Sequence, residues 1–180
     1  GYDYLMQAEA GWFSLTGEPD TPPARFGLSV VDLMTGLLHA YATTAAIIGA
    51  RAEGKGRDID VSLFDLALSN LSYPATWFLN GGHVQGREPR SGHPSLTPCG
   101  AQKTKDGWIF LMCNKEKFWP TLCDMIDRPQ WGQDPRYATF KERLERRPEI
   151  TEMLDEALSA RPTGKWLDLF AGKVPAAPIL

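Results

Sequence analysis

The sequence predicts a mixed chain in two parts, an α/β part over residues 1–85 and a smaller α+β part over residues 86–180. Three observations lead to this prediction. Small and apolar residues fill positions 33–52, which have the length and composition of a long helix. Residues 81–98 contain four glycines and three prolines, which is typical of a loop at a domain boundary. After this loop the pattern changes to short paired strands and amphipathic helices.

The first part begins with a predicted short helix and a loop. Apolar side chains between residues 3 and 15 predict a helix that ends at Gly17, and the prolines of residues 17–23 predict a loop. The long helix is predicted to end at Gly54. Because its many small side chains would let another backbone approach closely, we expect this helix to be buried against neighbours on more than one side.

The rest of the first part is predicted to hold one strand and one interrupted helix. Charged and apolar residues alternate over residues 57–63, which predicts a short strand. Ser62 is placed to cap a helix that runs from Leu63 towards Tyr73, and Pro74 is expected to kink or restart it.

The second part is predicted to contain a β-hairpin, three helices and a final strand. These are strands at residues 101–104 and 108–113, helices at 118–126, 147–160 and 163–172, and a buried strand at 174–180. Arginines and glutamates alternate over residues 142–149, which favours a solvated helix face. Four tryptophans could line a ligand groove, but their spacing favours the core of a small domain: Trp108, Trp119, Trp131 and Trp166.

Composition excludes several classes of function. The 180 residues carry a net charge of −3, which argues against a nucleic-acid partner. Three cysteines without CxxC spacing support neither a disulfide framework nor a metal site, and they fit a reducing cytoplasm. We expect no membrane partner, because no uninterrupted apolar run reaches the ~20 residues that span a bilayer. The chain lacks an initiator methionine and stops within a predicted strand, so we expect a piece of a longer protein.

Asp32 is the carboxylate that opens the long apolar run, and it has two interpretations. Aspartate is a preferred N-cap, because its side chain accepts from free N–H groups of the first helical turn. The same position would also favour a charged carboxylate that attacks an electrophile. The local sequence favours the cap and leaves the nucleophile open.

Two histidines are candidate site residues. His39 lies two helical turns after Asp32, about 10 Å along the axis, and is better interpreted as a packed histidine than as a catalytic partner. His93 lies in the glycine- and proline-rich loop, and such loops often carry binding residues. Spacing alone favours a surface histidine without a role.

Several stretches, in order along the whole chain, resemble the class III CoA-transferase family, whose members include formyl-CoA transferases. In the first part these are residues 2–8, 15–19, 31–36 and 58–63, and in the second part residues 106–109, 134–137 and 174–178. The resemblance implies that residues 1–85 are the later part of a Rossmann-like large α/β domain, followed by an incomplete α+β domain. It also implies an interlocked homodimer whose CoA-binding residues lie mostly in an N-terminal part outside this chain.

The resemblance implies that Asp32 is a nucleophile. In that family the aspartate of this segment carries CoA as an aspartyl thioester, formed and resolved through mixed anhydrides. The expected substrates are an acyl-CoA and a small carboxylic acid, with a dicarboxylate such as succinate as a reasonable acceptor. CoA is a substrate in this scheme, and neither a tightly bound cofactor nor a metal is expected.

The resemblance also nominates substrate-binding residues and two alternatives. Tyr2 and Asp3 match positions that line the active site, and Gly92 and His93 match a mobile glycine loop of which one glycine remains. A related α-methylacyl-CoA racemase is one alternative. The resemblance implies a His-Asp pair in racemases where this chain has Tyr2-Asp3. Tyrosine is a weak base at neutral pH, which favours the transferase. The other alternative is a non-catalytic α/β binding or assembly module in which Asp32 only caps a helix.

Overall fold

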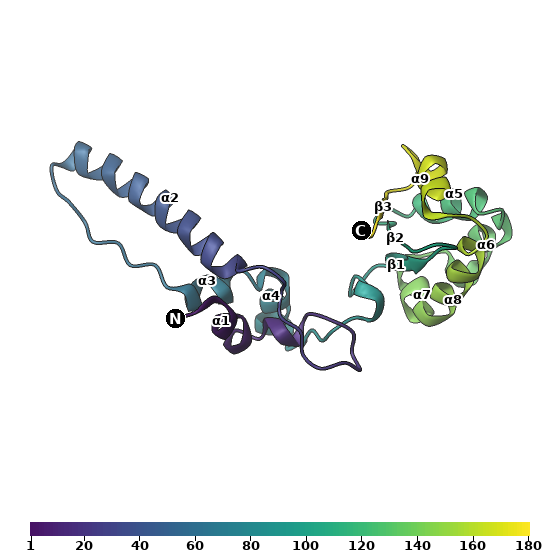
Figure 1. Ribbon diagram of the computed structural model, residues 1–180, viewed down its shortest axis with the longest axis horizontal. Helices are drawn as coiled ribbons and strands as arrows, with labels where there is room; N and C mark the ends of the chain where they lie inside the picture. The colour runs from purple at the N-terminus through teal and green to yellow at the C-terminus, as the bar shows by residue number, and fades with distance from the viewer. The chain divides into compact units, whose positions relative to one another are not determined.

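The computed structural model, which describes residues 1–180, divides into two units, Gly1–Arg87 and Glu88–Leu180 (Figure 1). The first unit is built from helices and loops, and the second combines a three-stranded sheet with helices.

The first unit consists of three short helices and one long one. They are α1 (Asp3–Glu9), α2 (Val30–Glu53), α3 (Leu63–Ser69) and α4 (Ser72–Gly81), with a 3-10 turn η1 (Trp12–Ser14). The N-terminal end of α2 packs beside α1 and α3, and the rest of α2 extends away from them (Figure 1). The helix ends where predicted, because Gly54 adopts a left-handed conformation with φ of 69° and its N–H donates to the carbonyl of Ala50.

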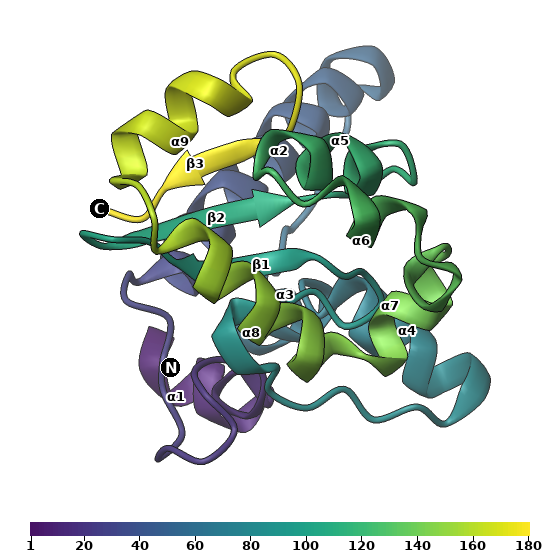
Figure 2. The same ribbon diagram turned by 90° about the vertical axis from the view of Figure 1, so that its right-hand side faces the viewer.

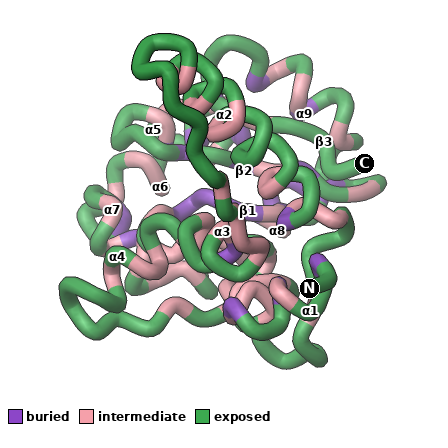
Figure 3. The backbone as a smooth tube through the Cα atoms, turned by 90° about the vertical axis from the view of Figure 1, so that its left-hand side faces the viewer, coloured by how far each residue is buried: buried purple, intermediate pink, exposed green.

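The expectation that α2 is buried on several sides is wrong for this chain. Val31 is its one buried residue, and most of the helix is exposed (Figure 3). The helix also has the length and composition of a membrane span, with a mean hydropathy of 1.3 over 18 residues, contrary to the expectation that no apolar run is long enough. Helices of soluble proteins meet the same criterion. The small and apolar residues of α2 are therefore available to a neighbour that this chain does not supply.

The prediction of a strand at residues 57–63 is also wrong. Residues 55–62 form a loop without a pairing partner, and a lone extended segment has no ladder to stabilise it. The cap at Ser62 is confirmed, since its hydroxyl accepts from the N–H of Asp65 at 3.3 Å. The helix is interrupted at Asn70 and restarts as α4, with Pro74 in the first turn as its missing N–H allows.

The core of the first unit is small. Its buried residues are Ala10, Val31 and Ala67, with partly buried side chains such as Met6 and Trp12 packed around them. The indole N–H of Trp12 donates to the carbonyl of Ala67 at 3.0 Å, which ties η1 to α3.

The second unit contains an antiparallel sheet in the order β1-β2-β3 with helices on one face (Figure 2). Its strands are β1 (Cys99–Lys103), β2 (Trp108–Met112) and β3 (Ala176–Pro178). Its helices are α5 (Phe118–Met125), α6 (Pro129–Gln133), α7 (Phe140–Glu145), α8 (Arg147–Leu158) and α9 (Thr163–Phe170), with 3-10 turns η2 (Pro89–Ser91) and η3 (Pro135–Tyr137). The predicted hairpin is confirmed, with Lys103 opposite Trp108 and Cys99 opposite Met112.

Alternation along β2 directs side chains to the two faces of this sheet. Ile109 and Leu111 are fully buried in the core, whereas Trp108 and Met112 on the other face are exposed. The tryptophan prediction is confirmed in part, since Trp119 and Trp166 are buried and Trp131 packs against the core.

Two predictions for the second unit need correction. The final strand β3 is short and largely exposed, because it pairs with β2 at the sheet edge. The arginines of residues 142–149 do not form a solvated face. Arg143 is 1% exposed, because its guanidinium donates to the carbonyls of Thr97 and Tyr137 and to the carboxylate of Glu116.

Candidate functional site

Asp32 lies in the first turn of α2, but it is not the N-cap. Ser29 occupies the cap position without a side-chain cap bond, so Asp32 is the third residue of the helix. The Asp32 side chain is exposed, and its carboxylate makes no hydrogen bond or ion pair within the chain. The positive end of the α2 dipole favours a carboxylate at this place. The Asp32 carboxylate is therefore accessible to solvent at a defined place on the helix.

Asp3 supplies the acceptor that Ser29 does not. Its Oδ2 accepts from the backbone N–H of Asp32 at 2.9 Å, across 29 residues of sequence. This bond satisfies one of the free N–H groups of the first turn of α2 and attaches that turn to α1. The structure thus brings together two of the residues predicted for the site, and it does so through the backbone of Asp32.

Gln7 completes this arrangement and was not identified from the sequence as a site residue. It is fully buried, and its Nε2 donates to Asp3 Oδ1 at 2.6 Å and to the carbonyl of Leu28 at 3.2 Å. Its Oε1 accepts from the N–H of Phe26 at 2.9 Å. The spacing of Asp3 and Gln7, four residues apart on one helix, was the signal that could have identified this pair.

Asp3 and Tyr2 have different environments. Asp3 is 4% exposed and both of its oxygens are occupied, so in this chain it orients α2 and does not present a free side chain to a ligand. Tyr2 is 77% exposed and precedes α1, where its carbonyl accepts from the N–H of Met6. The Tyr2 phenol is therefore accessible.

Gly92 and His93 belong to the second unit, whereas Asp32, Tyr2 and Asp3 belong to the first. His93 is half-buried in the loop that follows η2. Its N–H donates to the carbonyl of Cys99, and its own carbonyl accepts from Arg147. Burial, followed by the positive charge of Arg147, lowers the pKa of the His93 imidazole, although Glu88 opposes this shift. His93 is thus kept mostly neutral at physiological pH.

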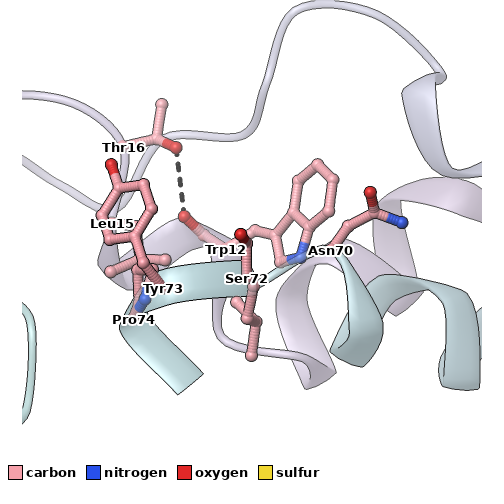
Figure 4. Close-up of a pocket in the computed structure, with 8 residues that line it drawn as sticks. Trp12, Leu15, Thr16, Asn70, Ser72, Tyr73 and Pro74 are labelled. Carbon is pink, nitrogen blue, oxygen red and sulfur yellow. Dashed lines mark hydrogen bonds between the residues drawn. The ribbon is translucent and has the colours of Figure 1, made fainter. Parts of the chain in front are cut away.

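Two cavities in the first unit lie away from Asp32. One of about 230 Å³ is lined by residues including Trp12, Asn70 and Tyr73, and Thr16 donates to the carbonyl of Trp12 beside it (Figure 4). The other, of about 550 Å³, is largely apolar and is lined by residues of α4 such as Phe78 and Leu79. None of Tyr2, Asp3 and Asp32 lines either cavity.

Other candidate chemistries find no support. The three cysteines are buried and unpaired, and burial raises the pKa of Cys113 and Cys123 to about 12, which keeps both as unreactive thiols. No three His, Cys, Asp or Glu side chains are grouped as a metal site would need.

His39 is exposed on α2 and is not the packed histidine that its spacing suggested. Asp32 remains the candidate nucleophile, with an exposed carboxylate.

The three curated relatives compared with this chain are all named as CoA-transferases. The chain is 34% identical over 180 residues to succinyl-CoA:glutarate CoA-transferase of Homo sapiens, covering 99% of this chain and 41% of the relative. It is 32% identical over 188 residues to succinate–glutarate CoA-transferase of Agrobacterium fabrum, covering 99% and 45%. It is also 32% identical over 182 residues to acetyl-CoA:oxalate CoA-transferase of Acetobacter aceti, covering 99% and 46%. The chain thus spans less than half the length of these relatives.

Solved structures and the family profile agree with those relatives. The crystal structure of a CAIB/BAIF family protein from Brucella suis matches with a TM-score of 0.84 and 31% identity, covering 100% of this chain and 48% of the other. The profile of CoA-transferase family III matches residues 1–180. The chain therefore belongs to the class III CoA-transferase family.

Proposed function

We propose that the protein of which these residues form part transfers CoA from an acyl-CoA to a carboxylic acid, with Asp32 as the nucleophile. One observation carries the proposal. The Asp32 carboxylate is exposed and has no partner in the chain, while the backbone N–H of the same residue is held by buried Asp3. A nucleophile has to be accessible and fixed in position at the same time, and this arrangement provides both properties.

The reaction can be written with each bond accounted for. An Asp32 oxygen attacks the thioester carbonyl and the C–S bond breaks. CoA departs as a thiolate, and the acyl group is now joined to Asp32 as a mixed anhydride. The thiolate then attacks the aspartyl carbonyl, which releases the donor acid and leaves an aspartyl-CoA thioester. The acceptor carboxylate attacks this thioester to give a second anhydride and thiolate. Attack of that thiolate on the acceptor acyl carbon forms the new acyl-CoA and restores Asp32. A carboxylate suits this sequence because it is both nucleophile and leaving group.

The names of the relatives support a dicarboxylic acid as acceptor. Those named above act on glutarate, succinate or oxalate, and a further relative from Haloarcula hispanica, 29% identical, is a succinyl-CoA:mesaconate CoA-transferase. Each of these acids carries two carboxylates, one to accept CoA and one available for recognition. We propose the same substrate class here.

The assembly and the location of the reaction are part of the proposal. The exposed α2 surface supports a homodimer in which a second subunit covers this helix. The three unpaired cysteines support a cytoplasmic protein.

Trapping the intermediate tests the function. The full-length protein is incubated with succinyl-CoA and treated with hydroxylamine or borohydride, and mass spectrometry locates the modification. We expect it at Asp32, with loss in Asp32→Ala and retention in Asp20→Ala, which changes an exposed loop aspartate. Absence of an adduct in the folded wild-type protein would overturn the proposal. Uptake of α-deuterium from solvent without an adduct would favour a racemase instead.

A further inference from the structure

Gln7 is a fully buried polar side chain in a unit whose apolar core has only three buried residues. It lies in α1, and its amide makes three hydrogen bonds, all within the first unit. A buried amide costs free energy unless its donors and its acceptor find partners. Since both donors and the acceptor of Gln7 are occupied by the protein, the role of this side chain is to hold the chain and not to bind a ligand.

Two of the three hydrogen bonds fix the segment that leads into α2. Gln7 Oε1 accepts from the N–H of Phe26 at 2.9 Å, and Nε2 donates to the carbonyl of Leu28 at 3.2 Å. The side chains of Phe26 and Leu28 are exposed, at 44% and 63%, so apolar burial does not hold this segment in place. Gln7 therefore fixes the backbone immediately before the first turn of α2, which begins at Val30.

The third hydrogen bond acts on the first turn of α2 itself. Gln7 Nε2 donates to Asp3 Oδ1 at 2.6 Å, while Asp3 Oδ2 accepts from the N–H of Asp32 at 2.9 Å. A carboxylate that accepts on both oxygens is oriented by both donors, and the loss of one donor leaves a buried oxygen unpaired. The orientation of Asp3, and with it the bond to the Asp32 backbone, therefore depends on Gln7.

The hydrogen bonds of Gln7 require two donors and one acceptor at the end of one side chain. A primary amide supplies all three, whereas an ionised carboxylate has no donor and a thioether has only a weak acceptor. Glutamate has nearly the same size and shape as glutamine and regains a donor when it is protonated. The requirement for a donor towards Asp3 can therefore be separated from the requirement for a side chain of this size.

We propose that Gln7 is a positioning residue for the reaction at Asp32. It holds the first turn of α2 from the segment that precedes it and, through Asp3, from the backbone of Asp32. The inference rests on the proposed function, because it concerns the rate at which Asp32 attacks an acyl-CoA. Gln7 touches no substrate in this scheme. It contributes by fixing the geometry between nucleophile and electrophile, on which such rates depend steeply.

Gln7→Met in the full-length protein removes the hydrogen bonds and keeps an unbranched side chain of similar length. We expect the rate of Asp32 adduct formation with succinyl-CoA to fall by about tenfold or more at every pH. The matched control is Gln130, an exposed glutamine of α6. Gln130→Met and Gln130→Glu should both form the adduct at the wild-type rate.

Gln7→Glu should show a dependence on pH that Gln7→Met lacks. A buried carboxyl group in contact with the Asp3 carboxylate favours the retention of one proton, because two adjacent negative charges repel. When protonated, the introduced carboxyl can again donate to Asp3 and accept from Phe26, and when ionised it cannot donate. Relative to wild type at the same pH, we expect a rate within about threefold near pH 6 and a decrease of about tenfold or more towards pH 9.

This pH profile distinguishes positioning from a purely structural role. Asp3 is the one titratable group among the partners of Gln7, and the ratio to wild type at each pH removes effects on Asp32 and on CoA. A purely structural role would lower the folded fraction, measured by circular dichroism at each pH, without changing the rate per folded molecule.

Two results would overturn the inference. One is a rate in Gln7→Met within about twofold of wild type, and the other is a ratio of Gln7→Glu to wild type that is the same at every pH. Failure of the wild type to form an Asp32 adduct would instead overturn the proposed function, and this inference with it.

If neither variant folds, amide hydrogen exchange of the wild-type protein at single-residue resolution replaces the kinetics. The N–H groups of Phe26 and Asp32 donate to the side chains of Gln7 and Asp3, whereas the N–H of Gly27 between them has no acceptor in the chain. After correction for intrinsic rates, Phe26 and Asp32 should exchange about tenfold or more slowly than Gly27. Equal exchange at the three positions would overturn the inference.

Discussion

The two units are similar in length but differ in how much apolar surface each buries by itself. In Gly1–Arg87 the core has three buried residues, whereas in Glu88–Leu180 it has fifteen. The first unit also leaves large apolar side chains on α2 exposed, among them Leu37 at 73% and Ile48 at 65%. The candidate nucleophile thus lies in the unit that is less able to stabilise itself.

This difference suggests that the two units are stabilised in different ways. Apolar burial is the main favourable term in folding, so the second unit has the means to fold as an independent scaffold. The first unit has to hold Asp32 with few buried side chains, and it does so with polar contacts from Asp3 and Gln7. The exposed apolar side chains of α2 are of the kind that marks an interaction site.

The largest effect is expected from separating the units. Residues 88–180 expressed alone should unfold in one cooperative transition, with a free energy of unfolding of ~5 kcal/mol or more. Residues 1–87 alone should show no cooperative transition, because three buried apolar residues cannot offset the loss of chain entropy. Circular dichroism during urea titration checks both. A cooperative transition in the first unit alone would break the comparison.

The next largest effect is expected when one leucine from each unit is changed to alanine in the 180-residue chain and the free energy of unfolding is compared. Leu154→Ala removes a fully buried side chain of the second core and should lower the free energy of unfolding by about 2–5 kcal/mol. Leu37→Ala, on the exposed face of α2, should change it by less than about 0.5 kcal/mol. Urea denaturation measures both. A loss at Leu37 as large as that at Leu154 would show that α2 is covered in solution.

The sequence predicted most of the local structure, because its signals were local. Gly54 ended α2, Ser62 capped α3, and the turn at Asp106 joined two strands, each through contacts within a few residues. The same reasoning failed where the outcome depended on a distant partner. Residues 57–63 alternate as a strand does but have no neighbour to pair with, and Arg143 lies among glutamates but reaches the carbonyl of Thr97, 46 residues away.

The candidate site shows the same limit. Asp32 was correctly placed at the start of a helix, but its side chain does not cap that helix. The acceptor in the first turn is instead Asp3, 29 residues earlier, which binds the N–H of Asp32. No local pattern fixes such a contact, although the spacing of Asp3 and Gln7 on one helix face was visible. The roles of Tyr2, Gly92 and His93 stay predictions, because they depend on a ligand.

Asp3→Asn is expected to give a smaller change in stability than the core leucine, with a separate effect on activity. Both partners of the Asp3 carboxylate, Gln7 Nε2 and the N–H of Asp32, are donors, and an asparagine can accept from only one of them. We expect a loss of about 1–3 kcal/mol of stability and a decrease on the order of tenfold to a hundredfold in the rate of Asp32 adduct formation in the full-length protein.

The control for Asp3 is Asp20→Asn, in an exposed loop, which should change neither quantity. Adduct formation by Asp3→Asn at the wild-type rate would show that the bond to the Asp32 N–H does not orient the nucleophile.

The smallest effect is expected at Asp106, which repeats in the second unit the device that Asp3 provides in the first. Its Oδ1 accepts from the N–H and the hydroxyl of Thr163, at 2.8 and 2.9 Å, so a hairpin turn caps the first turn of α9. These hydrogen bonds, first of all the one from the Thr163 N–H, lower the pKa of Asp106 from its ordinary value near 3.8. A carboxyl group whose pKa is lowered on folding stabilises the protein above its ordinary pKa, and this contribution disappears as the pH falls through the lowered value.

Asp106→Asn should therefore be slightly less stable than wild type at pH 7, and the difference should shrink as the pH is taken below about 3.8, the ordinary aspartate value. Urea midpoints of both proteins at pH 7 and at successively lower pH measure this, with Asp168→Asn, an exposed change on the same helix, as control. A difference that is the same at every pH would mean that the charge of Asp106 does not contribute. In that case, the stability gained from a carboxylate that caps another element would require a buried carboxylate. Asp3 is buried, whereas Asp106 lies at the surface.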